Sequence, residues 1–165
     1  IARRFNYLYG HVFPEPDAIL TKTSKVLGWD RRKMSKSYEN AIYLSDSPEV
    51  IREKVSKFIT DPDRKRRKDP GNPDICNVFD FHKLYSPREM IQAVDHQCRH
   101  AEIGCVEDKK QMAENLIAFL EPIREKRRYY EERPREVADI IITGSSRARE
   151  VARQTMEEVR AAIRI

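Results

Sequence analysis

After residue 46, the apolar residues of this chain recur every three or four positions, the spacing that puts them on one side of an α-helix. The first such segment is capped by Asp46 or Ser47, has Pro48 in its first turn and stops before Asp61. The last segment keeps one side apolar for four turns, through Ala148, Val151, Ala152, Thr155, Met156, Val159, Ala162 and Ile163. Because each apolar stripe must be buried against another, this pattern predicts a mainly α-helical, antiparallel bundle.

Two further helices are predicted in the middle of the chain. The second helix is expected to begin at Asn72 or Asp74. The third is expected to begin at Ser86, which is followed by Pro87 and Glu89 in the spacing of a capping box.

A long fourth helix is expected from Val106 onward, after a break at Gly104. Its internal Pro122 predicts a kink, because proline removes one backbone hydrogen bond and crowds the preceding turn. Gly144 is expected to end another short helix before the last one. Ahead of all the helices, residues 20–27 alternate loosely between apolar and polar side chains, which predicts a short strand.

Residues 33–37 read Lys33, Met34, Ser35, Lys36 and Ser37. Two ammonium groups three positions apart can follow a triphosphate as charge moves onto its leaving pyrophosphate, which stabilises the transition state more than the ground state. A basic pentapeptide is also compatible with a solvated loop that binds nothing. The pentapeptide is therefore a candidate phosphate-binding loop.

Positive charge is clustered in two stretches of a chain that has 32 basic and 27 acidic residues and a formal net charge of +5. The first cluster, opposed only by Asp30, consists of Lys22, Lys25, Arg31, Arg32, Lys33 and Lys36. The second is an uninterrupted run of Arg64, Lys65, Arg66, Arg67 and Lys68. Such a run can bind an RNA backbone by neutralising phosphates, or can serve only as a solubilising loop.

Arginines and aromatic rings are interleaved just after Pro122, as Arg124, Arg127, Arg128, Tyr129 and Tyr130. Aromatic faces beside guanidinium groups can stack on splayed RNA bases. The alternative is that the tyrosines pack against the last helix.

These segments together resemble bacterial-type tryptophanyl-tRNA synthetases, which are class I aminoacyl-tRNA synthetases. The resemblance rests on residues 2–6 (Ala-Arg-Arg-Phe-Asn), on Tyr9 and Gly10, on residues 27–46 with the KMSKS loop, on residues 60–62 (Thr-Asp-Pro) and on residues 69–73 (Asp-Pro-Gly-Asn-Pro). It covers essentially the whole chain, read as the C-terminal half of such an enzyme. It implies that residues 1–45 end a Rossmann-like catalytic domain and that residues 46–165 form a helical, anticodon-binding domain.

The resemblance also implies a function: ATP-dependent activation of tryptophan to its adenylate and transfer to tRNA(Trp), with magnesium arriving with ATP. Lys33 and Lys36 would be catalytic, and Lys33, Met34, Ser35, Lys36 and Ser37 would bind ATP. The residues expected to bind tRNA are Arg64, Lys65, Arg66, Arg67, Lys68, Arg124, Arg127 and Arg128. The full-length enzyme is expected to be a cytoplasmic homodimer. Because the first class I signature and the tryptophan pocket do not occur in this sequence, the chain alone is expected to be inactive.

Two other functions stay open: a tyrosyl-type or other class I synthetase, and a non-catalytic RNA-binding module that retains the loop. No apolar run approaches the roughly 20 residues of a membrane span, and no signal peptide is visible. The chain starts at Ile1 and reads like the middle of a domain.

The three cysteines raise the question of a metal. Some tryptophanyl-tRNA synthetases of this branch hold an iron–sulfur cluster with four cysteines spaced C-x22-C-x6-C-x2-C. Here Cys76, Cys98 and Cys105 match the first three, with one residue fewer in the first gap, and Asp108 takes the fourth place. Because a carboxylate is a harder ligand than a thiolate, we expect a metal-free site. A cluster with Asp108 or water as the fourth ligand is the alternative.

None of the four histidines, His11, His82, His96 and His100, is expected to be catalytic. His96 and His100 lie one helical turn apart and could ligate zinc, but a half-exposed polar face is the expected role.

Overall fold

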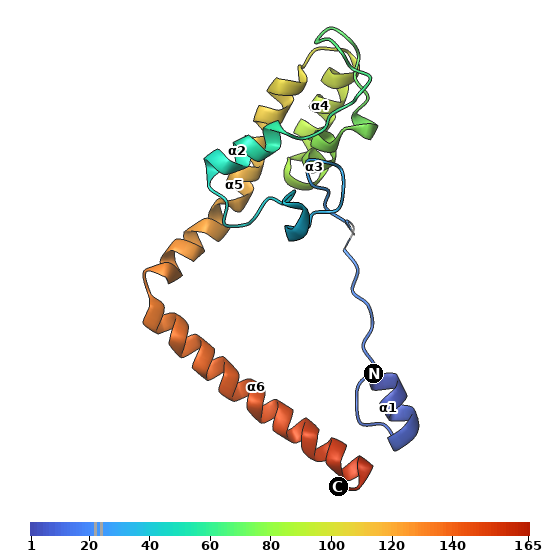
Figure 1. Cartoon of the computed structure of the whole chain (residues 1–165), viewed down its shortest axis with the longest axis vertical. Helices are drawn as coiled ribbons and strands as arrows, with labels where there is room; N and C mark the ends of the chain where they lie inside the picture. Colours follow the sequence, from blue (N-terminus) through green and yellow to red (C-terminus); the bar gives the residue numbers. More distant parts are fainter. Residues whose placement is uncertain (22, 24) are drawn as a thin grey trace. The chain divides into compact units, whose positions relative to one another are not determined.

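The computed structural model describes residues 1–21, 23 and 25–165 and is mainly α-helical (Figure 1). The helices are α1 (Ala2–Tyr9), α2 (Pro48–Ser56), α3 (Asn77–Tyr85), α4 (Arg88–Arg99), α5 (Cys105–Glu131) and α6 (Pro134–Ile163), with short 3-10 turns η1 (Lys36–Tyr38) and η2 (Pro73–Ile75). The chain divides into two compact units, one of Ile1–Lys22 with Arg128–Ile165 and one of Thr23–Arg127.

The larger unit, residues 23–127, is built around a core shared by α2, α3, α4 and α5. Its buried apolar residues include Ile51, Val55, Phe58, Val78, Phe79, Phe81, Val94, Met112, Leu116 and Leu120. The rings of Phe58 and Phe81 meet edge to face, with 4.7 Å between their centroids. Full burial of each such side chain is worth about 1.5–3 kcal/mol. The apolar residues with helical spacing in this region therefore form its core, as predicted. The antiparallel order of the helices stays a prediction.

The predicted start of the first of these helices is confirmed, and that of the second is wrong. Ser47 caps α2, because its side chain accepts a hydrogen bond from the N–H of Val50. The second predicted start is too early: Asn72 caps only the turn η2, by accepting from the N–H of Asp74, and α3 begins at Asn77.

The predicted capping box at Ser86 is wrong. Helix α4 follows Pro87 with no side-chain cap. The hydroxyl of Ser86 lies 2.7 Å from Nδ1 of His82 and accepts from Nδ2 of Asn115 (2.8 Å). Tertiary partners therefore bind the hydroxyl that the local pattern assigned to the helix start.

Helix α5 begins directly after Gly104, as predicted, and contains Pro122. The side chain of Arg124 donates from Nη2 to the carbonyl oxygen of Ile117 (2.7 Å), one turn before the proline. The predicted kink stays a prediction.

In the smaller unit, the turn after α1 is held by Asn6. Its Oδ1 accepts from the N–H groups of Val12 (3.1 Å) and Phe13 (3.0 Å), and its Nδ2 donates to the carbonyl of Phe13 (2.7 Å). The ring of Phe5 contacts both Tyr9 and Phe13. The residues quoted at the start of the chain thus form one short helix and its closing turn.

The prediction that Gly144 ends a helix is wrong, because α6 runs through it to Ile163. A glycine inside a helix costs only about 0.5–1 kcal/mol relative to alanine. Ion pairs along the helix, such as Arg153 with Glu150 (2.7 Å) and Glu157 (3.2 Å), add to its stability. No residue of α6 is buried: in its apolar stripe Val151 and Met156 are exposed, whereas Val159 and Ile163 are half-buried.

The strand predicted over residues 20–27 is not confirmed. In the part of the chain that the structure describes there is no sheet, and Leu27 makes an isolated antiparallel bridge with Lys33. Lys22 and Ser24 lie outside the described residues. Among those described, no helix has the length and apolar character needed to cross a bilayer.

Two glycine substitutions test these helices and loops as a matched pair. A Cβ on Gly144 meets nothing within 4 Å, so Gly144→Ala is expected to stabilise α6 by about 0.5–1 kcal/mol. A Cβ on Gly71 would lie 2.6 Å from Sγ of Cys98, so Gly71→Ala is expected to destabilise the fold by about 1–3 kcal/mol. Thermal unfolding followed by far-ultraviolet circular dichroism measures both. Shifts of the same sign would contradict this packing.

Candidate functional site

The predicted ATP-binding loop is preceded by a tight turn at Gly28. The N–H of Gly28 donates to the carbonyl of Arg32 (2.8 Å), and the N–H of Met34 donates to the carbonyl of Val26 (3.1 Å). A Cβ on residue 28 would lie 2.5 Å from the backbone oxygen of Asn40, closer than atoms can approach. Glycine is therefore required for this turn to close against Asn40.

Asn40 fixes the loop from inside. Its side chain is fully buried, and its Oδ1 accepts from the N–H of Ser35 (2.8 Å). Its Nδ2 donates to Oδ1 of Asp30 (2.8 Å) and to the carbonyl of Lys33 (3.4 Å). One amide therefore holds both ends of the segment from residue 30 to residue 35. This role was not predicted, because an asparagine in a loop carries no distinctive sequence signal.

Asp30 links this amide to the first basic cluster. Desolvation raises the pKa of its carboxyl, but hydrogen bonds from Asn40 and Arg32 outweigh that effect and leave the pKa below its usual value. The guanidinium of Arg32 lies 2.7 Å from Asp30 and stacks over the ring of Tyr38, 4.3 Å from its centroid. Arg32 is therefore part of the support of the loop.

The five residues of the KMSKS loop divide into an inner and an outer set. Met34 and Ser35 are half-buried, and Met34 packs against the core. Ser35 caps η1 by accepting from the N–H of Ser37 (3.3 Å). Lys33, Lys36 and Ser37 are exposed. The fold thus presents two ammonium groups to solvent on a hydrogen-bonded backbone.

The turn before the loop is also fastened to the helices of its unit. The buried Asn77, at the start of α3, donates from Nδ2 to the carbonyl of Gly28 (2.7 Å). The N–H of Ile59 donates to the carbonyl of Trp29 (3.0 Å). The loop is therefore continuous with the helical core.

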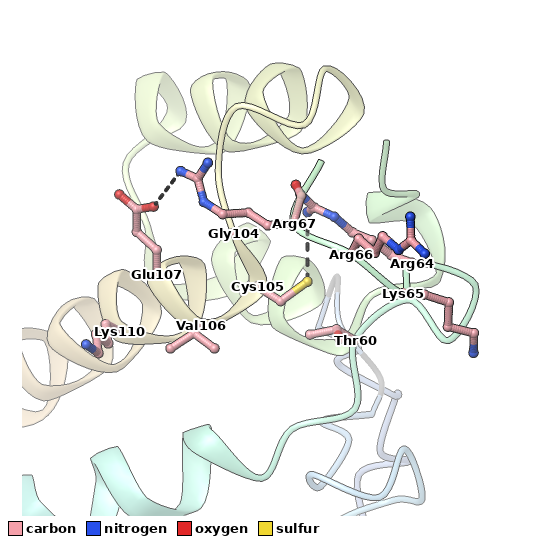
Figure 2. Close-up of a pocket in the computed structure, with 10 residues that line it drawn as sticks. All are labelled: Thr60, Arg64, Lys65, Arg66, Arg67, Gly104, Cys105, Val106, Glu107 and Lys110. Atoms are coloured by element: carbon pink, nitrogen blue, oxygen red, sulfur yellow. Dashed lines mark hydrogen bonds and ion pairs between the residues drawn. The ribbon is translucent and has the colours of Figure 1, made fainter. Parts of the chain in front are cut away.

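The second basic stretch borders a cavity of about 590 Å³ (Figure 2). The lining consists of Thr60, Arg64, Lys65, Arg66, Arg67, Gly104, Cys105, Val106, Glu107 and Lys110. Lys65, Arg66, Arg67 and Lys68 are exposed, and Nη2 of Arg67 lies 3.8 Å from Glu107. Cations therefore outnumber acids five to one around this cavity.

Arg64 differs from the rest of the run because it is half-buried. Its Nη2 donates to the carbonyls of Arg67 (2.8 Å) and Ile103 (2.7 Å). Its Nη1 lies 3.8 Å from the sulfur atoms of Cys98 and Cys105, and Figure 2 shows the contact with Cys105. Arg64 thus ties the basic loop to the junction of α4 and α5.

The arginines after Pro122 differ in their burial. Arg124 is only 7 % exposed, and its Nη2 lies 2.6 Å from Oε2 of Glu121. Arg127 and Arg128 are exposed.

Tyr129 contacts the first turn of α6, ahead of the segment after Gly144 that was expected to be the last helix. The guanidinium of Arg133 lies 3.8 Å from its ring centroid, and its hydroxyl donates to Glu136 (3.2 Å). Tyr130 meets the same ring edge to face, at 5.1 Å. At least one of the two tyrosines therefore has a structural role.

Cys98 and Cys105 lie beside Arg64, and all three cysteines are free. Cys76 and Cys98 are buried, and burial raises the pKa of the Cys76 thiol to about 11. Asp108, at the fourth position of the cluster motif, is 6 % exposed and lies 3.0 Å from Nε2 of His82. Within the part of the chain that is described, no three histidine, cysteine or acidic side chains are placed to hold one metal ion. Because Asp108 is already bound to His82, the metal-free site stays a prediction.

The histidine pair on α4 is a polar surface feature. The rings of His96 and His100 stack at 4.1 Å, and Nδ1 of His100 lies 2.8 Å from the carbonyl of His96. His82 is the histidine whose importance the sequence did not reveal, because a single buried histidine leaves no spacing to recognise.

Comparison with known proteins agrees with this geometry. The chain is 50 % identical over 166 residues to the tryptophan–tRNA ligase of Aquifex aeolicus, and the match covers all of this chain and 42 % of that protein. It is 48 % identical to the tryptophan–tRNA ligase of Thermotoga maritima, over all of this chain and 51 % of that protein. The chain thus spans about half the length of these relatives.

One solved structure is similar to nearly the whole chain. It is tryptophanyl-tRNA synthetase from Campylobacter jejuni complexed with ADP and tryptophane, with a TM-score of 0.81 and 27 % identity. The likeness covers 99 % of this chain and 51 % of that one. The family model described as "tRNA synthetases class I (W and Y)" matches residues 1–121. Because that match covers most of the length of this chain, the chain belongs to this class I family of tRNA synthetases.

Proposed function

We propose that the chain is the C-terminal half of a tryptophan–tRNA ligase. Residues 1–45 would end the catalytic domain, and residues 46–165 would form the anticodon-binding domain. The family includes both tryptophan and tyrosine enzymes, and the names of the relatives support tryptophan. The ligands of the Campylobacter jejuni enzyme support an adenine nucleotide and tryptophan as substrates.

In the proposed reaction, the carboxylate of tryptophan attacks the α-phosphate of ATP and pyrophosphate leaves. The adenylate then passes its tryptophanyl group to tRNA(Trp). Magnesium would arrive with ATP. No side chain needs to act as a base, because the protein's contribution is alignment and neutralisation of charge.

One observation carries the proposal: Asn40 holds the backbone of residues 33–35 while the ammonium groups of Lys33 and Lys36 stay exposed. Cations that are positioned before the reaction lose little energy to reorganisation when charge develops on the leaving group. Met34 and Ser35 would position the nucleotide through their place in this backbone, and Ser37 would close the loop.

We assign tRNA binding to the two remaining groups of cations. Exposure and the adjoining cavity support Lys65, Arg66, Arg67 and Lys68 as phosphate contacts. Arg64 would act by orienting that loop. Arg127 and Arg128 are the accessible members of the second group, whereas burial of Arg124 favours a supporting role.

The bundle is proposed to hold no iron–sulfur cluster, since the buried Asp108 is already bound to His82. The homodimeric state of the full-length enzyme and its location in the cytoplasm stay predictions. The chain alone is expected to form no adenylate.

The loop is tested in the full-length enzyme by Lys36→Ala. The rate of adenylate formation is expected to fall by about two to four powers of ten with little change in tryptophan affinity, because the interaction strengthens in the transition state. Lys33→Ala is expected to act in the same direction but less strongly. Tryptophan-dependent pyrophosphate exchange measures both, with Lys83→Ala on α3 as an exposed-lysine control. Normal rates in both loop variants would refute the assignment.

The basic run is tested by replacing Lys65, Arg66, Arg67 and Lys68 together with glutamine. Binding of tRNA is expected to weaken, and the slope of log affinity against log salt should flatten by roughly 0.7–0.9 for each phosphate that the protein no longer neutralises. A control removes the same charge elsewhere, at Arg52, Lys57, Lys83 and Arg88. An unchanged slope in the first variant would return the run to the role of a solubilising loop.

A further inference from the structure

His82 lies at the centre of a buried polar chain that joins α3 to α5. Its side chain is fully buried, and Nε2 lies 3.0 Å from Oδ1 of Asp108. Nδ1 lies 2.7 Å from the hydroxyl of Ser86, which also accepts from Nδ2 of Asn115 (2.8 Å). Asp108 and Asn115 are both on α5, while His82 and Ser86 are on α3 and directly after it.

The partners determine which ring nitrogen carries the hydrogen. The carboxylate of Asp108 only accepts, so Nε2 of His82 carries the hydrogen, and the hydroxyl of Ser86 donates to Nδ1 while it accepts from Asn115. Nδ1 is then an acceptor, and Nε2–H donates to the carboxylate of Asp108. In this arrangement every polar side-chain atom of the imidazole has a partner, as buried groups require.

The same hydrogen bond makes Asp108 a poor candidate for a metal ligand. Its carboxylate is nearly buried and already accepts from His82, whereas Cys98 and Cys105 contact the guanidinium of Arg64. If Asp108 gave up this hydrogen bond to bind a metal, the imidazole N–H of His82 would be buried without a partner, which is costly in free energy.

We propose that the His82–Asp108 hydrogen bond, extended through Ser86 and Asn115, crosslinks α3 and α5 in place of the metal centre that four thiolates would hold there. The cysteines stay unmetallated, and Arg64 fastens the basic loop to two of them. The proposal does not depend on the tRNA or ATP assignments, because neither substrate takes part in these contacts.

The crosslink is tested first by stability. Asp108→Ala strands the N–H of His82, and the midpoint of thermal unfolding is expected to fall by about 3 to 10 °C. His82→Ala should have an effect of the same order, and the double variant should lose less than the sum, because the same hydrogen bond is absent from all three. Asp80→Ala, a partly exposed acid on α3 paired with Lys83, is the control and should change the midpoint little. An Asp108→Ala midpoint equal to the control would overturn the proposal.

Two measurements do not depend on folding of the variants. Nitrogen chemical shifts of the wild-type protein should show the Nε2–H tautomer for His82, and the Nδ1–H tautomer would contradict the network. After oxygen-free incubation with ferrous iron and sulfide, the wild-type chain should stay colourless. Stoichiometric iron and sulfide in it would overturn the proposal.

The last experiment changes residue 108 to the cysteine of the four-thiolate motif. Asp108→Cys supplies a fourth thiolate while removing the acceptor of His82, so this variant should bind iron and sulfide where the wild type does not. An iron-free Asp108→Cys protein would show that residue 108 is not what decides between the two kinds of crosslink, and would also overturn the proposal.

Discussion

The hydrogen bonds of one buried amide, that of Asn40, determine the shape of the segment on which the proposed function rests. They join residues 30, 33 and 35, and the turn at Gly28 packs directly on the same residue. Without them the loop would be a flexible basic peptide, and in the proposed reaction its backbone would have to be ordered when ATP reacts. With them, that ordering is part of folding.

A similar division between inner and outer groups occurs in the second basic stretch. Arg64 is turned inward onto carbonyl and sulfur atoms, while its neighbours in the run are exposed beside a cavity. His82 and Asp108 join the helices that flank the same region. In both places buried polar contacts fix the backbone, and the cations that are left exposed are the ones able to meet phosphate.

The sequence was informative where a feature is local or periodic. Ser47 and Pro48 fixed the start of α2, the break at Gly104 preceded α5, and the stripes at Ile51 and Met112 became core. It failed where a partner distant in the chain decides. The hydroxyl of Ser86 serves His82 and Asn115 rather than a helix start. The prediction at Gly144 failed for a different reason: the small cost of one glycine does not end a long helix. Asn40, Asn77 and His82 have no motif, so their roles emerge only when the chain is folded.

The most direct test of this account is a double-mutant cycle between Asn40 and Lys36 in the full-length enzyme, read by the rate of adenylate formation. If Asn40 acts by holding the loop, Asn40→Ala should slow the reaction by about one to three powers of ten while tryptophan affinity is kept. The double variant with Lys36→Ala should then be slower than Lys36→Ala alone by a smaller factor than Asn40→Ala costs by itself, because one of the two ammonium groups on the loop that Asn40 holds is already gone. An unchanged rate in Asn40→Ala, or fully multiplicative losses in the double variant, would contradict the claim that this buried amide prepares the loop for catalysis.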